Sequence, residues 1–221
     1  MKRIFTLLSV AACLLAADAS LQDKGVEIDF NGKKITVKRD MNEKCIELDQ
    51  NADNAWGGKY AADSVPAECK GSFINFMGYI SPVKIEGVET YGELETLEFL
   101  QKLKSDKKKY IFVDSRMTSW FETGTIPGAV NMPFVHFVQQ KKFDKELREH
   151  LLALGVSING DKYDFSKAKT ALFFCNGIWC GQSPQAIAAL IKIGYPKEKI
   201  LWYRGGMQDW RSVGFTTTST K

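Results

Sequence analysis

Short apolar segments alternate with helical patterns in the second half of the chain, and this alternation limits the possible folds more than any other feature. Residues 110–113, 171–174 and 199–203 are almost continuously apolar, which is typical of strands buried on both faces. Helix patterns precede or separate them, with apolar side chains three or four positions apart at Leu94, Leu97, Leu100 and Leu103, and again at Phe143, Leu147, Leu151 and Leu154. The alternation predicts an α/β fold, a parallel sheet flanked by helices on both faces.

The chain before residue 87 has a different texture, with short strand patterns and many loop-forming residues. Residues 26–37 alternate apolar and polar side chains around Asn31 and Gly32, a pair that favours a tight hairpin turn. We therefore predict a small N-terminal β-rich subdomain at residues 20–86 and the α/β domain at residues 87–221.

Residues 1–19 have the form of a secretory signal peptide. Lys2 and Arg3 are followed by an apolar run over residues 4–16 and by the small-x-small sequence of residues 17–19. The apolar run is shorter than the roughly 20 residues that a membrane-spanning helix needs. We expect cleavage of this segment and a periplasmic protein without a membrane span. A lipid-tethered form through Cys13, at the end of a lipobox-like segment, is the weaker alternative, because apolar residues follow that cysteine.

Export to an oxidising compartment would leave four cysteines in the mature chain. Cys45 and Cys69 flank a loop-like stretch, so a structural disulfide between them is one prediction, and two free buried thiols are the other.

Charge and histidine content argue against two classes of function. The formal net charge is +4, with 30 basic and 26 acidic residues, a bias too weak to indicate nucleic-acid binding. The two histidines, His136 and His150, lie outside the loops that follow the predicted strands, so neither a zinc site nor a Cys-His hydrolase is supported.

The loop after the strand at residues 171–174 is the candidate reactive segment, because ligands of such sheets bind beyond the carboxyl ends of the strands. It begins with Cys175 and runs into a helix expected at about residues 184–193, with Ser183 as N-cap and Pro184 as first helical residue. Backbone N–H groups and the helix dipole at such a position lower a thiol pKa and stabilise an anion on sulfur. The plainer interpretation is that Cys175 is simply the last buried residue of its strand.

Three segments, in this order, resemble the rhodanese-like (thiosulfate sulfurtransferase) family in what would be an exported bacterial form. They are residues 111–116 with 124–133, the Cys175 loop, and residues 201–210 (LWYRGGMQDW). The resemblance covers about residues 88–217. It implies that Cys175 is a catalytic nucleophile that carries sulfane sulfur as a persulfide, with no metal or organic cofactor. It also implies a cradle of loop amides around the sulfur, formed by Asn176, Gly177, Ile178, Trp179, Cys180 and Gly181.

The implied reaction is ping-pong transfer from a thiosulfate- or polysulfide-like anion to a thiol or another nucleophilic acceptor. This chain departs from the family pattern because its loop is longer and carries Cys180 where an Arg, Lys or Thr is frequent. Arg116 and Arg204 are candidate substrate contacts, and the alternative for Arg116 is a structural pair with a neighbouring carboxylate. Asp114 is either a general base or, as we favour, a structural hydrogen-bond acceptor.

Cys180 is either a resolving thiol for Cys175 or a space-filling residue against Trp179. Two other functions stay open from the sequence. One is a thiol-disulfide redox protein that uses Cys175 and Cys180. The other is a non-catalytic binding module of the same fold, with a protein partner on the N-terminal region.

Overall fold

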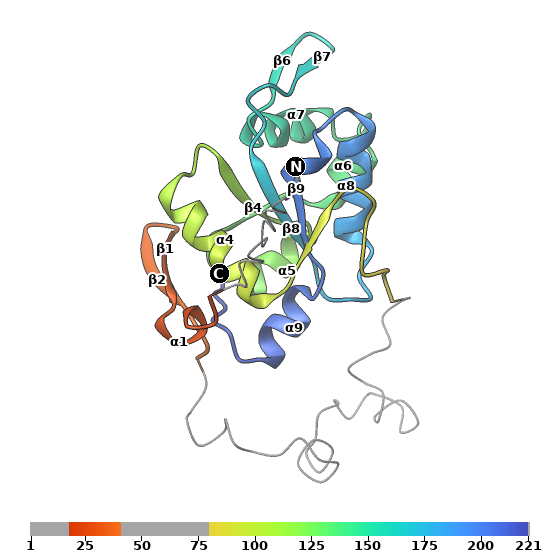
Figure 1. The fold of residues 1–221 in the computed structure, drawn as a ribbon. Helices are drawn as coiled ribbons and strands as arrows, with labels where there is room; N and C mark the ends of the chain where they lie inside the picture. The colour runs from red at the N-terminus through yellow and green to blue at the C-terminus, as the bar shows by residue number, and fades with distance from the viewer. Residues whose placement is uncertain (1–17, 41–79, 221) are drawn as a thin grey trace, which may run out of the picture.

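The computed structural model describes residues 18–40 and 80–220 (Figure 1). The lipobox cysteine Cys13, the predicted disulfide between Cys45 and Cys69, and nearly all of the predicted signal peptide lie outside these residues. Across the two described stretches, no helix has the length and apolar character needed to cross a membrane.

A five-stranded parallel sheet forms the centre of the molecule, in the order β3-β9-β8-β4-β5. Its strands are β3 (Glu89–Tyr91), β4 (Tyr110–Asp114), β5 (Ala129–Asn131), β8 (Thr170–Phe174) and β9 (Ile200–Tyr203). The ends of three strands are in register, because Phe174 pairs with both Asp114 and Tyr203. The loops that follow β4, β8 and β9 therefore meet at one edge of the sheet.

Helices cover both faces of the sheet, which confirms the predicted fold class (Figure 1). Phe173 and Phe174 point to opposite faces, as successive strand residues must, and each joins a different apolar cluster. The Phe174 cluster includes residues of α4 (Glu93–Ser105) and α9 (Gly206–Ser212). The Phe173 cluster includes residues of α6 (Phe134–Val138), α7 (Asp144–Ala153) and α8 (Gln182–Lys192).

The small N-terminal β-rich part is present as α1 (Leu21–Lys24) and an antiparallel hairpin of β1 (Val26–Phe30) and β2 (Lys33–Val37). Its turn has Asn31 at φ 49° and Gly32 at φ 75°, the left-handed pair that the sequence predicts. Val26 and Ile28 join the apolar cluster of α4, and Arg39 forms an antiparallel bridge with Phe215. The described hairpin thus packs on the α/β core, while the predicted domain boundary at residue 86 stays a prediction.

The start of α8 differs from the sequence prediction. The helix begins at Gln182 with Gly181 as N-cap, so Ser183 and Pro184 lie inside the first turn. The reason is a turn within the loop, where the Cys180 N–H donates to the Gly177 carbonyl at 2.9 Å and brings the chain into helical geometry earlier.

Several short elements also lie outside the prediction, because they are too short to show a period. They include α5 (Thr118–Thr123), the hairpin of β6 (Ser157–Asn159) and β7 (Lys162–Asp164), and the 3-10 helix η2 (Lys197–Lys199).

Candidate active site

Two free thiols share the loop between β8 and α8. Cys175 is 1% exposed and Cys180 is 4% exposed. Neither belongs to the two apolar clusters of the sheet, although both are buried. The Cys175 Sγ lies 3.4 Å from the Cys180 carbonyl oxygen, to which it donates. The Cys175 side chain therefore faces its own loop, and not the apolar interior.

The start of α9 holds this loop in place. The Met207 N–H donates to the Cys175 carbonyl at 3.0 Å, and the Gln208 N–H donates to the Asn176 carbonyl at 2.8 Å. The Gln208 side chain also accepts a hydrogen bond from Trp179 Nε1 at 2.6 Å. The loop is thus fixed by a helix that follows the neighbouring strand β9.

The surroundings of Cys180 favour a negatively charged sulfur. A hydrogen bond from the Cys175 side chain lowers the pKa of Cys180 to about 6, although burial opposes this shift. The backbone N–H groups of Asn176 and Gln182 act in the same direction on this pKa. Asn176 Nδ2 also donates to the Cys180 Sγ at 3.7 Å.

Cys175 has the opposite tendency. Burial raises the pKa of the Cys175 thiol well above its ordinary value, and the neighbouring Cys180 raises it further. The hydroxyl and backbone N–H of Ser183 act against this rise in pKa but do not cancel it. The pair is therefore asymmetric, with an anion favoured on Cys180 and a neutral thiol on Cys175, whereas the sequence analysis placed the anion on Cys175.

Comparison with known proteins identifies the fold that carries this pair. The family model of the rhodanese-like domain matches residues 96–213. This chain belongs to the rhodanese-like domain family. The matched region includes the whole cysteine loop and four of the five strands of the sheet. No curated protein matches the sequence.

The solved structures similar to this rhodanese-like chain include a rhodanese and a homologue of single-domain rhodanese. A rhodanese with anions from E. coli has 19% sequence identity and a TM-score of 0.32, over 50% of this chain and 98% of that one. Saccharomyces cerevisiae Ygr203w, a homologue of single-domain rhodanese and of the Cdc25 phosphatase catalytic domain, has 20% identity and a TM-score of 0.42, over 61% and 86%. The family assignment rests on the family model and not on these distant similarities.

The amides that surround the sulfurs of this rhodanese-like domain are only partly those expected. Asn176 belongs to the predicted set 176–181, but Gln182 and Ser183 contribute N–H groups from the first turn of α8. The Cys180 N–H, also predicted for the cradle, donates within the loop turn instead. The sequence prediction missed the Gln182 amide because it placed the start of the helix at about residue 184, two residues later than the structure does.

Asp114 and Arg116 form a buried ion pair beside the cysteine loop. Their closest atoms, Asp114 Oδ2 and Arg116 Nη2, lie 2.6 Å apart. The same carboxylate accepts hydrogen bonds from the Arg116 N–H and the Thr125 hydroxyl, and Arg116 Nη2 donates to the Gly124 carbonyl. Asp114 is 0% exposed and Arg116 is 4% exposed. This geometry gives no support to substrate contact by either side chain and is that of a structural corner.

Arg204 is engaged with the segment that precedes β3. Its Nε and Nη2 donate to the Ser81 carbonyl at 3.1 and 2.6 Å, and the Ser81 N–H donates to the Ile178 carbonyl at 2.7 Å. Arg204 thus supports the cysteine loop through Ser81. Direct contact with a substrate stays a prediction.

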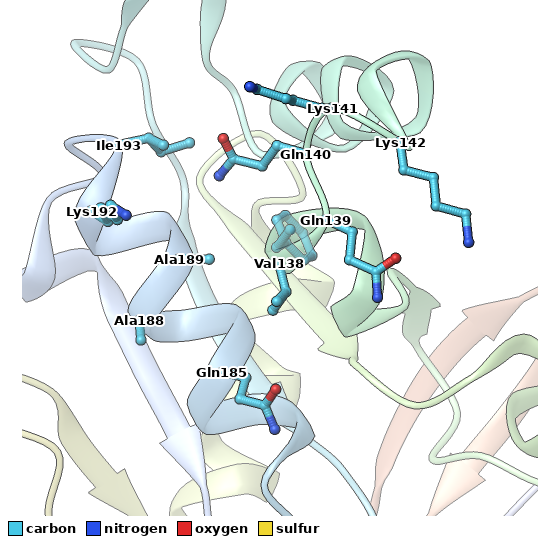
Figure 2. Close-up of a pocket in the computed structure, with 11 residues that line it drawn as sticks. Val138, Gln139, Gln140, Lys141, Lys142, Gln185, Ala188, Ala189, Lys192 and Ile193 are labelled. Carbon is cyan, nitrogen blue, oxygen red and sulfur yellow. The ribbon is translucent and has the colours of Figure 1, made fainter.

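A groove of about 750 Å³ runs along α8 but is not lined by either thiol. Figure 2 shows Gln185 near one end of it and Ile193 near the other. Lys141 and Lys142 contribute from the segment that follows α6. The Gln185 N–H donates to the Gly181 carbonyl, so the groove begins one helical turn beyond the cysteine loop. The candidate chemistry lies in the loop and not in this groove.

Proposed function

We propose that this rhodanese-like protein is a sulfurtransferase whose loop of residues 175–183 carries sulfane sulfur as a persulfide. The observation that supports this function best is the contact between two free thiols in the loop between β8 and α8, where hydrogen bonds from the loop lower the pKa of Cys180. A thiolate at neutral pH is the form of cysteine that attacks sulfur.

The transfer has two steps. In the first, a loop thiolate attacks the sulfane sulfur of a thiosulfate- or polysulfide-like donor, and the S–S bond of the donor breaks with its electron pair on the leaving group. In the second, the nucleophilic acceptor attacks the outer sulfur of the persulfide, and the cysteine leaves as a thiolate. The loop amides stabilise the negative sulfur before and after loading. The family resemblance assigns the sulfur to Cys175.

Incubation of the reduced, purified protein with thiosulfate or polysulfide tests this function. We expect the gain of one sulfur atom within the loop, measured by intact mass and by mapping of the peptide that contains Cys175 and Cys180. Peptide mapping separates the loop from Cys13, Cys45 and Cys69. A protein that takes sulfur from neither donor would contradict the proposal.

The contact between the two thiols also favours a second candidate, a thiol-disulfide redox protein. In that case a disulfide oxidant or peroxide removes two hydrogens from the Cys175–Cys180 pair, and no sulfur is gained with either sulfur donor. A non-catalytic binding module would show neither change.

A further inference from the structure

We propose that the groove along α8 is a docking site for an acidic segment of a partner protein, and that this protein accepts the sulfur from the cysteine loop. The docking site is argued from the groove itself. The role of the docked protein as acceptor rests on the proposed sulfurtransferase function.

Two walls form the groove (Figure 2). One is α8 from Gln185 to Ile193, and the other is the end of α6 with the residues that follow it, 137–142. Gln185 and Ile193 are eight helical positions apart, so this wall is about 12 Å long. With a volume of about 750 Å³, the groove is large enough for a short peptide segment with its side chains.

The surface of the groove is mostly apolar between its two walls. Ala188 and Ala189 line it from α8, and Val138, which is 46% exposed, lines it from α6. Apolar side chains of a bound segment would remove this surface from water. The groove also has amide side chains that can pair with the backbone of such a segment, namely Gln139, Gln140 and Gln185.

The charges of the groove indicate which segment fits. Lys141, Lys142 and Lys192 line it, and none of the described residues that line it is acidic. The three lysines are exposed, and none of them forms an ion pair within residues 18–40 and 80–220. Uncompensated positive charges beside an apolar surface are complementary to a segment that carries carboxylates around apolar side chains.

The position of the groove connects docking with sulfur transfer. Its end at Gln185 lies one helical turn from the cysteine loop, because the Gln185 N–H donates to the Gly181 carbonyl at 3.0 Å. The α6 wall is held near the same loop. The Phe134 N–H donates to the Ser115 carbonyl, and the Ser115 hydroxyl accepts a hydrogen bond from the Ser183 hydroxyl. A segment that lies in the groove therefore reaches the loop within a few residues.

Transfer to the docked protein is the second step of the proposed reaction. The acceptor thiolate attacks the outer sulfur of the Cys175 persulfide, and a new S–S bond forms between these two atoms. The bond between the outer sulfur and Cys175 Sγ breaks with its electron pair on Cys175, so the negative charge passes from the acceptor to Cys175. Docking holds the acceptor thiol at the loop and thereby raises its effective concentration there.

The experiment uses the reduced full chain, loaded with thiosulfate and freed of excess donor. Two synthetic peptides of equal length act as acceptors. Each has the same apolar residues and one terminal cysteine, and the remaining positions are glutamate in one peptide and lysine in the other. Cyanide is the small acceptor, and each peptide rate is divided by the cyanide rate, so that a change in loading alone has no effect. At low salt we expect the glutamate peptide to accept sulfur about tenfold faster than the lysine peptide, a preference that added salt should weaken.

Two variants with the same net charge test whether the groove causes this preference. The groove variant should lose it and carries Lys141→Glu, Lys142→Glu and Lys192→Glu. The control should keep it and carries the same change at exposed lysines that precede β4 and β8, at the opposite edge of the sheet, Lys107→Glu, Lys108→Glu and Lys167→Glu. Equal losses in both variants would show that overall charge selects the peptide, and the docking site would be wrong.

A binding measurement that needs no sulfur chemistry keeps the two proposals separate. A fluorescent glutamate peptide without cysteine should bind the unloaded wild type, and the groove variant should bind it about tenfold more weakly. Ala188→Trp, which fills the groove without a change of charge, should also weaken binding, and thermal unfolding shows whether each variant keeps the wild-type fold. A photo-crosslinker in the peptide should react with residues 138–142 or 185–193.

The possible failures are distinct. If neither peptide binds, as when another part of this chain or a second copy fills the groove, or if the crosslinks lie elsewhere, the docking site is wrong. If the glutamate peptide binds in the groove but accepts sulfur no faster than the lysine peptide, the acceptor role is wrong. If it binds there while the loop gains no sulfur from thiosulfate and transfers none to cyanide, the proposed sulfurtransferase function fails and the docking site stands.

Discussion

Two loops that follow neighbouring strands at the same edge of the sheet have very different interiors. After β4, Asp114 and Arg116 form an ion pair whose remaining contacts go to Thr125 and Gly124. After β8, Cys175 and Cys180 contact each other and a set of backbone N–H groups. Both pairs are buried, so burial alone does not distinguish a structural corner from a reactive loop.

The two pairs differ in the number of chemical states that their contacts stabilise. The carboxylate of Asp114 is matched by a permanent positive charge and by a hydroxyl, so its contacts stabilise one chemical state. The amides around the thiols favour an anion on sulfur, which is a thiolate before the proposed loading and would be a persulfide after it. A loop of the second kind is suited to a change of chemical state.

Removal of the carboxylate from the first loop should have the largest effect on stability. Asp114→Ala leaves the Arg116 guanidinium buried without its partner, and we expect the free energy of unfolding to fall by about 3–5 kcal/mol. Urea unfolding measures this loss. The folded fraction should still gain sulfur in the thiosulfate assay, and loss of that gain would revive Asp114 as a general base.

The matched control for this variant is Glu149→Ala. Glu149 lies 3.9 Å from Lys145 in an exposed pair on α7, with side chains 61% and 84% exposed. Such pairs contribute about 0–1 kcal/mol. Equal losses of unfolding free energy in the two variants would show that the buried Asp114–Arg116 pair does not stabilise the loop after β4 more than an exposed pair would.

The sequence predicts the long elements of this fold better than the short ones. The long elements are visible because burial gives them a period, as with Leu97 and Leu100 on α4 or the apolar run of β8. Three-residue strands such as β5 show no period and are set by pairing with β4.

At the candidate site, the sequence places Cys175 and Cys180 in one loop but not the asymmetry between them. That asymmetry depends on where α8 begins, since the Gln182 and Ser183 amides reach the sulfurs only from a helix that starts before Ser183. Likewise, Gln208 supports Trp179 across 29 positions of sequence, a contact that no local pattern contains.

A glycine that supports the second loop offers the next test. Gly206 has φ 58°, and a Cβ there would clash with the Cys175 carbonyl oxygen. Gly206→Ala should therefore displace the backbone of Cys175 and slow sulfur loading. Gly160→Ala is the control, because Gly160 has the same φ of 58° with nothing within 4 Å of the added Cβ.

Both glycine variants incur the cost of a left-handed alanine, about 1–2 kcal/mol. Only Gly206→Ala adds a steric clash, for which we expect a further loss of about 1–3 kcal/mol in urea unfolding. If the two variants have equal stability and equal loading rates, the contact of α9 with the cysteine loop does not matter for either property.

The smallest expected effect is on the pH dependence of stability and concerns a third pair of titratable side chains. This pair tests whether contact between titratable groups is enough to mark a reactive site. His136 Nδ1 and His150 Nε2 lie 2.9 Å apart with stacked rings. Burial, and then the charge of His136, lower the pKa of His150 to about 4. The unfolded chain, with an ordinary pKa of about 6.5, binds more protons between these values, so the free energy of unfolding should fall as pH drops from 6.5 to 4.

His150→Gln removes this proton uptake, so its melting temperature should fall less than that of the wild type between pH 7 and pH 5. Part of the acid sensitivity should remain, because burial also lowers the pKa of His136. Sulfur loading by His150→Gln should equal that of the wild type, since the histidines pack near Phe137 and Phe143 and not at the cysteine loop. If His150→Gln loses sulfur loading, the histidine pair also contributes to the reaction, and the contrast between the cysteine pair and the structural pairs is wrong.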